Sequence, residues 1–236
     1  LQQIQELPMK MMQFVSLINP TDAIHAIDRI IDKRKDAILI HNSSFMTGLY
    51  YELSGLCQTE NCLTILAALE ILKNRGYEIS KKDYHTGFSD VCEMTGLMGR
   101  WQKLQSYPDV ICDTGHNADG FKCIRQQLNY IHNKLNQELH IVFGMVNDKD
   151  ISSVLELLPK DATYYFTKAS VKRALPEDEL MKMASEAGLK GTSYPTVADA
   201  VRAAKENCPP KDFIFVGGSN FIVADLLANR DTLNLY

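Results

Sequence analysis

The stretch DVICDTGHNADGFKCIRQQLNYIHNKLNQELHIVFG, residues 109–144, contains an apolar run, a helical pattern and a second apolar run. Residues 110–112 and 139–143 are short and almost entirely apolar, which is typical of strands buried on both faces of a sheet. Between them, large apolar residues recur at spacings of three and four and predict one buried helix face; they are Phe121, Ile124, Leu128, Ile131 and Leu135. Strand, helix and strand in this order predict a parallel β-α-β unit.

The same alternation continues to the end of the chain. Further strands are predicted at residues 162–166, 192–194 and 213–216, and amphipathic helical patterns separate them. Right-handed crossovers between such strands build an open, doubly wound, mostly parallel α/β sheet of the Rossmann-like kind. We expect residues 57–236 to form this domain.

The N-terminal part is less regular. Residues 21–34 predict a helix that Thr21 or Asp22 can cap, because isoleucines recur on one face. Residues 37–40 predict a short strand, and residues 49–56 predict an extended segment. We therefore expect a helix and a strand ahead of the α/β domain.

Two helices are predicted between this part and the regular alternation. A helical period begins at Asn61 and stops before Gly76, which suits the position after a helix end. The next helix begins near Ser80, since Ser80 and Asp83 have the spacing of a capping box.

Composition excludes several classes of protein. The chain has 236 residues, 45% hydrophobic and 23% charged, with a formal net charge of -4, and this gives no electrostatic case for nucleic acid. No apolar run is long enough for a membrane span, and residues 1–10 lack the basic-then-apolar order of a signal peptide. The six cysteines form no CxxC pair, so a reduced, cytoplasmic protein is expected. The chain begins without Met, which suggests a fragment of a longer protein.

Ligands of an open α/β sheet bind beyond the carboxyl ends of its strands. The segments that follow the predicted strands carry glycines and polar groups, and they are residues 113–117, 144–150, 167–174 and 217–220. Because these segments share one edge of the sheet, we expect the functional site there.

Asp113 and His116 are candidates with alternative interpretations. The Asp113 carboxylate could accept from ribose hydroxyls, hold a metal-bound water or orient His116, or Asp113 or Asn117 could simply cap the helix. His116 could act as a general base or hydrogen-bond donor, or be structural.

Arg100 and Ser219 are two further candidates. Arg100 follows a glycine and could bind a phosphate through its guanidinium fork, or lie on the surface beside the only Trp, Trp101. Ser219 follows two glycines at a helix start, where it could help bind an anion or merely cap the helix. The chain contains no GxxxxGK[ST] phosphate loop, no GxGxxG, no GxSxG and no zinc-ligand spacing, so this domain alone cannot build a standard triphosphate cradle.

Six elements, in order, resemble those of the folylpolyglutamate and dihydrofolate synthases. The resemblance runs over about residues 49–227. Its elements are CQTEN at 57–61 (YQxxN in the family), GRW at 99–101, DTGHN at 113–117 (DxxHN), GMVNDKD at 144–150, TYYFTK at 163–168 with Arg173-Ala174, and GSNF at 218–221. Cys57 departs from the usual Tyr, and Thr114-Gly115 departs from a small apolar pair.

The resemblance implies an ATP- and Mg²⁺-dependent ligase. In this family ATP phosphorylates a carboxylate of dihydropteroate or of a folate γ-glutamyl tail, and L-glutamate then attacks the acyl phosphate. By resemblance, Asn61, Arg100 and Asp113 contact ATP, His116 and Ser219 bind substrate, and Arg100 and His116 are catalytic. The metal ligands would lie mainly in an N-terminal ATPase domain, whose end and linker would be residues 1–56. The chain alone is then expected to be inactive.

Two other functions remain open. A Mur ligase C-terminal domain shares the fold and reaction type, but its segment usually reads DYAH(T/N/H)P and one type carries DNPR. Here Ala118 stands where Pro would be, and DNPR does not occur, which favours the folate branch. A non-catalytic binding module of the same fold is the third possibility.

Overall fold

The computed structural model describes residues 28–32, 37–41, 49–147 and 150–236. Two compact units divide the chain, Leu1–Leu97 and Met98–Tyr236. The second unit contains the predicted parallel sheet and is described first.

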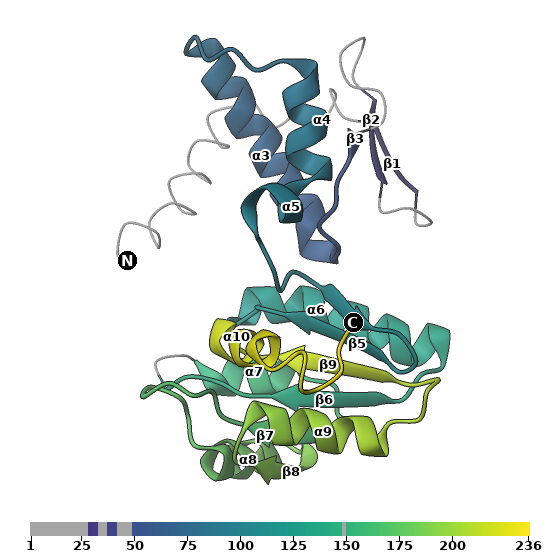
Figure 1. The fold of residues 1–236 in the computed structure, drawn as a ribbon, viewed down its shortest axis with the longest axis vertical. Coiled ribbons are helices and arrows are strands. Elements are labelled where there is room, and N and C mark those ends of the chain that lie inside the picture. Colours follow the sequence, from purple (N-terminus) through teal and green to yellow (C-terminus); the bar gives the residue numbers. More distant parts are fainter. Residues whose placement is uncertain (1–27, 33–36, 42–48, 148–149) are drawn as a thin grey trace. The chain divides into compact units, whose positions relative to one another are not determined.

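A six-stranded sheet forms the centre of the second unit (Figure 1). Its strands, in spatial order, are β4 (Gln102–Gln105), β5 (Asp109–Asp113), β9 (Phe213–Gly217), β6 (Leu139–Phe143), β7 (Ala162–Thr167) and β8 (Lys190–Tyr194). All neighbours pair in parallel except β4, which runs antiparallel to β5. The predicted α/β fold class is confirmed, whereas β4 was missed because its QKLQ sequence is polar and edge strands need no apolar run.

Helices cover both faces of this sheet. On one face lie α6 (Ala118–Leu135), α7 (Ile151–Leu157) and α8 (Glu177–Glu186), and on the other α9 (Val197–Asn207) and α10 (Asn220–Ala228). The apolar face of each helix packs on alternate residues of the strands. Phe213 and Phe215 of β9 pack against the helices of the first face, and Ile214 and Val216 pack against those of the second. Continuous apolar strands are therefore required, since both of their faces are buried.

The first unit begins with a small antiparallel sheet of β1 (Asp28–Asp32), β2 (Ala37–His41) and β3 (Leu49–Tyr50). The predicted strand at 37–40 is confirmed, and the predicted helix over 21–34 is wrong for residues 28–32. Isoleucines favour a pleated strand, and here the backbone pairs Ile30 with Leu39. The proposed caps Thr21 and Asp22 lie outside the described residues.

Three helices follow, α3 (Leu56–Asn74), α4 (Lys81–Ser89) and α5 (Val91–Thr95). The capping box before α4 is confirmed: the Ser80 N–H donates to Asp83 Oδ2 at 2.8 Å, and the Asp83 N–H donates to Ser80 Oγ at 3.3 Å. In contrast, α3 begins at Leu56 rather than at Asn61, so the CQTEN segment is helical.

The predicted domain boundary at residue 57 stays a prediction. The compact unit that contains the sheet begins at Met98, so α3, α4 and α5 belong to the first compact unit. The reason is a separate apolar cluster, in which Tyr84 and Phe88 of α4 pack with Tyr51 and Cys62. These helices are therefore stabilised by their own small core.

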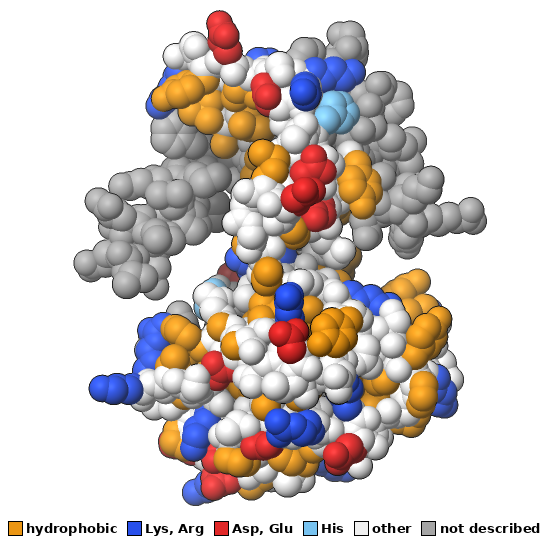
Figure 2. All heavy atoms as spheres, in the orientation of Figure 1, with side chains coloured by type: hydrophobic (Ala, Val, Ile, Leu, Met, Phe, Trp, Pro, Cys, Tyr) orange, Lys and Arg blue, Asp and Glu red, His pale blue; other side chains and the backbone are white. Residues whose placement is uncertain are grey.

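Surface and bonding properties agree with an ordinary globular core. Lys, Arg, Asp and Glu side chains are interspersed over the visible face of the second unit (Figure 2). None of the six cysteines, all in the described part of the chain, forms a disulfide. No helix among the described residues is long and apolar enough to cross a bilayer.

The two leucines of α6 provide a test of the predicted packing. Leu128 is fully buried, as predicted, whereas Leu135, which the sequence placed on the same buried face, is 53% exposed because it is the last residue of the helix. We expect Leu128→Ala to lower the free energy of unfolding by about 2–5 kcal/mol, because it leaves a cavity beneath the sheet. Leu135→Ala, a matched control on the same helix, should stay within about 0.5 kcal/mol of wild type.

Urea unfolding monitored by Trp101 fluorescence measures this difference, because Trp101 is the only Trp of the chain and lies in the second unit. Equal losses in the two variants would contradict the assignment of the buried helix face.

Candidate functional site

The carboxyl ends of the central strands lie side by side at one edge of the sheet. In the strand register, Gly217 of β9 pairs with Asp113 of β5 on one side and with Phe143 of β6 on the other. Phe143 in turn pairs with Phe166 of β7. The loops that leave these strands are therefore neighbours, as the sequence predicted.

Two glycines let these loops approach backbone to backbone. The Gly144 N–H donates to the Gly217 carbonyl at 3.2 Å, and a Cβ at Gly144 would lie 2.5 Å from the Thr167 carbonyl oxygen. Gly218 has φ +106°, and a Cβ there would collide with the Gly144 carbonyl oxygen. No larger residue fits either position without moving the backbone.

Asp113 bonds to two separate backbone segments. Its Oδ2 accepts from the Trp101 N–H at 2.8 Å, and its Oδ1 accepts from the Gly115 N–H at 2.7 Å. Burial raises the pKa of this carboxyl, while these two bonds and the nearby Arg100 guanidinium oppose the rise. Through these two bonds Asp113 links the GRW segment to the DTGHN segment. The sequence did not reveal this connection.

Asn117, rather than Asp113, caps α6. The Asn117 Oδ1 accepts from the Gly120 N–H at 2.8 Å, so the simpler interpretation of Asn117 is confirmed. His116 is partly buried, and its Nδ1 lies 3.1 Å from the Thr114 carbonyl oxygen. Because a carbonyl only accepts, a bonded Nδ1 carries the proton, and Nε2 of neutral His116 is then an acceptor.

Arg100 lies in a tight loop between β4 and the preceding helices. Its side chain is exposed, whereas Trp101 packs on Phe213 and Phe215 with ring centroids 6.3 and 5.8 Å away. Trp101 has φ +47°, a left-handed conformation that costs a non-glycine residue about 1–2 kcal/mol. Packing and the bond to Asp113 hold it there.

Ser219 caps α10 in the structure. It is 2% exposed, and its Oγ accepts from the Ile222 N–H at 3.2 Å. The capping interpretation is therefore confirmed, and the substrate-binding role of Ser219 stays a prediction.

Sequence reasoning assigned no role to Arg173, which the structure places at the same edge. Its guanidinium lies 4.8 Å from the centre of the Phe221 ring in α10, and its carbonyl accepts from the Asn147 N–H at 3.0 Å. The RA element of the resemblance was the only signal for it. Residues 148 and 149 of the neighbouring GMVNDKD element lie outside the described residues.

Four of the five predicted site residues come together at this edge: Arg100, Asp113, His116 and Ser219. Asn61 lies in α3 of the first unit, where its Nδ2 donates to Gln58 Oε1 at 3.0 Å, and its role stays a prediction. Within the described part of the chain, no group of three or more His, Cys, Asp or Glu is placed to hold a metal ion.

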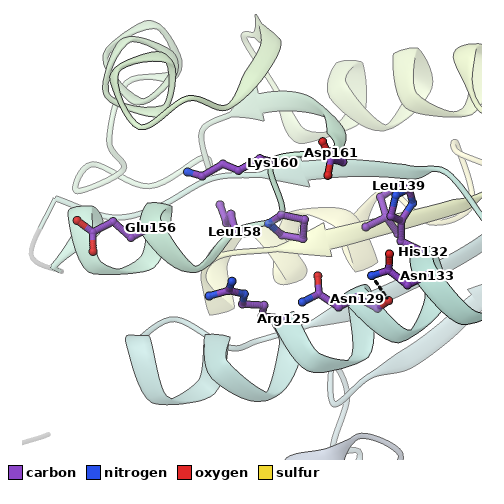
Figure 3. Close-up of a pocket in the computed structure, with 10 residues that line it drawn as sticks. Arg125, Asn129, His132, Asn133, Leu139, Glu156, Leu158, Lys160 and Asp161 are labelled. Atoms are coloured by element: carbon purple, nitrogen blue, oxygen red, sulfur yellow. Dashed lines mark hydrogen bonds between the residues drawn. The ribbon is translucent and has the colours of Figure 1, made fainter.

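A separate hollow of about 240 Å³ opens towards the amino ends of β6 and β7 (Figure 3). Asn129 and His132 of α6 line it together with Lys160 and Asp161, which precede β7. None of the predicted site residues lines this hollow. Its charges are mixed, and we assign it no part in the chemistry.

One family model matches this region of the chain. The model for the Mur ligase, glutamate ligase domain covers residues 99–220, which is more than half of the chain. The match includes Arg100, Asp113, His116 and Ser219, and it excludes Asn61.

Two curated relatives show the range of similar proteins. A dihydrofolate synthase/folylpolyglutamate synthase of Buchnera aphidicola subsp. Schizaphis graminum is 28% identical over 171 residues, 72% of this chain and 39% of that protein. A UDP-N-acetylmuramoyl-L-alanyl-D-glutamate--2,6-diaminopimelate ligase of Buchnera aphidicola subsp. Baizongia pistaciae is 26% identical over 224 residues, 90% of this chain and 42% of that protein. The chain thus spans less than half the length of these relatives.

A solved structure has the same fold. The bifunctional folylpolyglutamate synthase/dihydrofolate synthase of Yersinia pestis, complexed with AMPPNP and Mn ion, superposes with a TM-score of 0.61 at 24% identity, covering 79% of this chain and 42% of that chain. The predicted resemblance to this family of ligases is confirmed at the level of the C-terminal domain.

The close approach of the loops can be tested at Gly218. Gly188, which follows α8, also has a positive φ, +82°, but a Cβ there would meet nothing within 4 Å. We expect Gly188→Ala to cost about 1–2 kcal/mol of stability from backbone strain alone. Gly218→Ala should cost about 1–3 kcal/mol more, since the added methyl collides with the Gly144 carbonyl.

Thermal or urea unfolding of the two variants measures this difference in stability. Equal destabilisation would mean that the loops after β6 and β9 are not in contact through Gly218.

Proposed function

This chain belongs to the Mur ligase, glutamate ligase domain family, and we propose that it is the C-terminal half of an ATP-dependent ligase that adds L-glutamate to dihydropteroate, to folate γ-glutamyl tails, or to both. The observation that carries the proposal is the edge where Arg100, Asp113, His116 and Ser219 meet. The curated folate relative named above supports the choice of substrates.

The reaction places particular demands on this edge. A carboxylate oxygen of the acceptor attacks the γ-phosphorus of ATP, the bond to the ADP oxygen breaks, and an acyl phosphate results. The amine nitrogen of glutamate then attacks the acyl carbon, phosphate leaves, and the amine gives up a proton. Negative charge gathers on phosphate and carbonyl oxygens in both steps, so donors fixed beforehand stabilise the transition states.

Arg100 suits the phosphate groups. Its guanidinium is permanently charged, carries five N–H donors and lies exposed at the carboxyl edge. In our proposal Arg100 contacts ATP and offsets the charge of the transferred phosphoryl group. We propose Asn61 and Asp113 as further contacts of ATP, on the strength of the resemblance.

His116 suits the proton of the attacking amine. With Nδ1 directed at the Thr114 carbonyl, Nε2 is an acceptor that can take a proton from the glutamate ammonium. Ser219 and the start of α10 suit a substrate carboxylate, because Ser219 satisfies one of the unpaired N–H groups of the helix and leaves others for a ligand.

ATP supplies the phosphoryl group that activates the acceptor carboxylate, and Mg²⁺ neutralises its phosphates. The donors at the edge fit the nucleotide, whereas we propose that the metal ligands lie mainly in an ATPase domain preceding residue 57, with residues 1–56 as its end and linker. The cytoplasm is the compartment that we propose.

One observation favours a second candidate function, a Mur-type peptide ligase. The relative with that activity covers 90% of this chain, although DNPR is absent and Ala118 replaces the usual Pro. Assaying the full-length gene product with dihydropteroate, tetrahydrofolate and UDP-muramoyl peptides separates the two. If none of these substrates supports ATP turnover, a non-catalytic binding module is favoured instead.

We expect the isolated chain to turn over no ATP, because its sequence contains no GxxxxGK[ST] loop to hold the triphosphate. Phosphate release with glutamate and a folate substrate present measures this, with the full-length gene product as the positive control. Glutamate-dependent ATP turnover by the isolated chain would refute the proposal that it is inactive without an ATPase domain.

In the full-length gene product, Arg100→Ala and Asp113→Ala should each lower kcat/KM at least tenfold, or about 1.4 kcal/mol of transition-state stabilisation. Arg125→Ala is the matched control, because Arg125 is an exposed arginine of α6 away from this edge. Wild-type kinetics in both site variants would contradict the assignment of Arg100 and Asp113 to the site.

A further inference from the structure

We propose that Phe221 and Asp225 of α10 are positioning residues that hold the loop after β7, so that Arg173 in this loop binds a carboxylate of the incoming amino acid. We refer to residues 168–174 as the Arg173 loop. The inference rests on the proposed function and deepens it, because it gives the amino-acid half of the reaction side chains of its own.

Asp225 binds the Arg173 loop through both oxygens of its carboxylate. Its Oδ2 accepts from the Ser170 N–H at 2.6 Å, and its Oδ1 accepts from the Ser170 hydroxyl at 2.8 Å. Hydrogen bonds to an ionised carboxylate are among the stronger ones in proteins, and two of them side by side also fix direction. This clamp therefore sets both the position and the orientation of Ser170 relative to α10.

Phe221 contacts the same loop one helical turn earlier. Residues four positions apart lie on one face of a helix, so Phe221 and Asp225 share a face of α10. The Arg173 guanidinium lies 4.8 Å from the centre of the Phe221 ring, within the range of a cation–π interaction. One face of α10 thus holds the side chain of Arg173 and the backbone three residues before it.

The loop after β6 holds the Arg173 backbone from another direction. The Asn147 N–H donates to the Arg173 carbonyl at 3.0 Å, and the Leu175 N–H donates to the Met145 carbonyl at 3.0 Å. Within the loop, Ala169 is buried in the apolar layer that includes α9 and α10. An exposed side chain on a backbone fixed in this way loses less entropy when a ligand binds.

The two arginines of this edge belong to segments that contact different sides of α10. A Cβ at Gly99, next to Arg100, would lie 2.8 Å from Val223 Cγ1, so the GRW segment meets α10 at Val223. Val223 and Phe221 are two positions apart, which is a rotation of about 200° around a helix axis. The proposed reaction has two kinds of anion, phosphate and carboxylate, and one arginine on each side of α10 suits both.

A guanidinium matches a carboxylate, because two parallel N–H···O bonds fix orientation as well as position. Glutamate held by a carboxylate keeps its amine nitrogen available for attack on the acyl carbon. Arg173 therefore serves binding, and its loss should raise KM for glutamate more than it lowers kcat.

The clamp can be tested without an activity assay, because Lys172 and Arg173 are exposed trypsin sites within the loop. Asp225→Ala should speed cleavage after these residues by about fivefold or more, since local opening exposes the backbone to the protease. Asp225→Asn should stay within about twofold of wild type, because its amide oxygen can accept from the Ser170 N–H and its amide nitrogen can donate to the hydroxyl.

Asp231→Ala is the matched control for cleavage, since Asp231 is an exposed carboxylate beyond the end of α10. Mass spectrometry of the early tryptic fragments measures the rate at each site. Wild-type cleavage of the Arg173 loop in Asp225→Ala would overturn the clamp.

Steady-state kinetics of the full-length gene product test what the loop does. Arg173→Ala should raise KM for glutamate about tenfold or more and change KM for ATP less than about twofold. Lys172→Ala is the control, because it removes a neighbouring exposed charge of the same sign, and it should leave both constants unchanged.

Double-mutant cycles test whether α10 acts through Arg173. Asp225→Ala should raise KM for glutamate about fivefold, yet less than about twofold when Arg173 is already Ala. Phe221→Leu should behave in the same way, whereas Phe221→Tyr keeps the aromatic ring beneath the guanidinium and should stay close to wild type.

The outcomes separate this inference from the proposed function. If the full-length gene product transfers no glutamate, the proposed function fails and the role of Arg173 fails with it, while the clamp is judged by proteolysis. If glutamate is transferred but Arg173→Ala keeps the wild-type KM for glutamate, only the inference fails. If the effects of Asp225→Ala and Arg173→Ala multiply, Asp225 is not a positioning residue for Arg173. General damage to the fold would raise KM for ATP as well and lower the unfolding temperature.

Discussion

Insertion of β9 between β5 and β6 is the constraint on which the rest of the site depends. The last strand of the chain enters the middle of the sheet, so its carboxyl end meets that of β5 at Asp113 and that of β6 at Phe143. The loop after the final strand thus reaches the loop after the first parallel strand, about a hundred residues earlier. Without this order, Ser219 and Asp113 would lie at different places along the edge.

The same insertion explains why glycines occur at 144 and 218. Three parallel strands that end at one level place their outgoing loops only about 5 Å apart, which is the spacing of the strands themselves. Side chains at these turns would meet neighbouring carbonyls, as Gly144 and Gly218 show. The cost in chain entropy is offset by backbone contacts that keep the edge rigid, and a rigid edge is where donors can be fixed before a ligand arrives.

The sequence predicted most of the sheet domain, because its strands and helices follow simple periods. The stripe on α6 and the capping box at Ser80 depend on residues within four positions of one another, and both were identified. The strand β1 was mistaken for a helix, since Ile30 and Ile31 suit either structure and only pairing with β2 decides between them. The division into compact units at Leu97 has no local signal either, because the small core of Tyr51, Cys62, Tyr84 and Phe88 joins residues far apart in the chain. The candidate site residues stay predictions, and the bond from Trp101 to Asp113 spans twelve positions, so no local pattern reveals it.

Asn117 and Ser219 each cap a helix that starts at this edge. Each helix start has four unpaired N–H groups, and a single side-chain acceptor satisfies only one or two of them. Both α6 and α10 begin at the carboxyl edge, because each follows a parallel strand directly, so their positive ends face the same region. Asp113 is buried, and its carboxylate accepts from backbone N–H groups, while Asp119 in the first turn of α6 is paired with Lys122 at 2.8 Å. The local field at this edge therefore favours an anion even though the chain as a whole carries a net charge of -4. The phosphate and the carboxylate substrate of the proposed reaction are both anions, and an edge with two helix starts beside an exposed arginine suits such ligands.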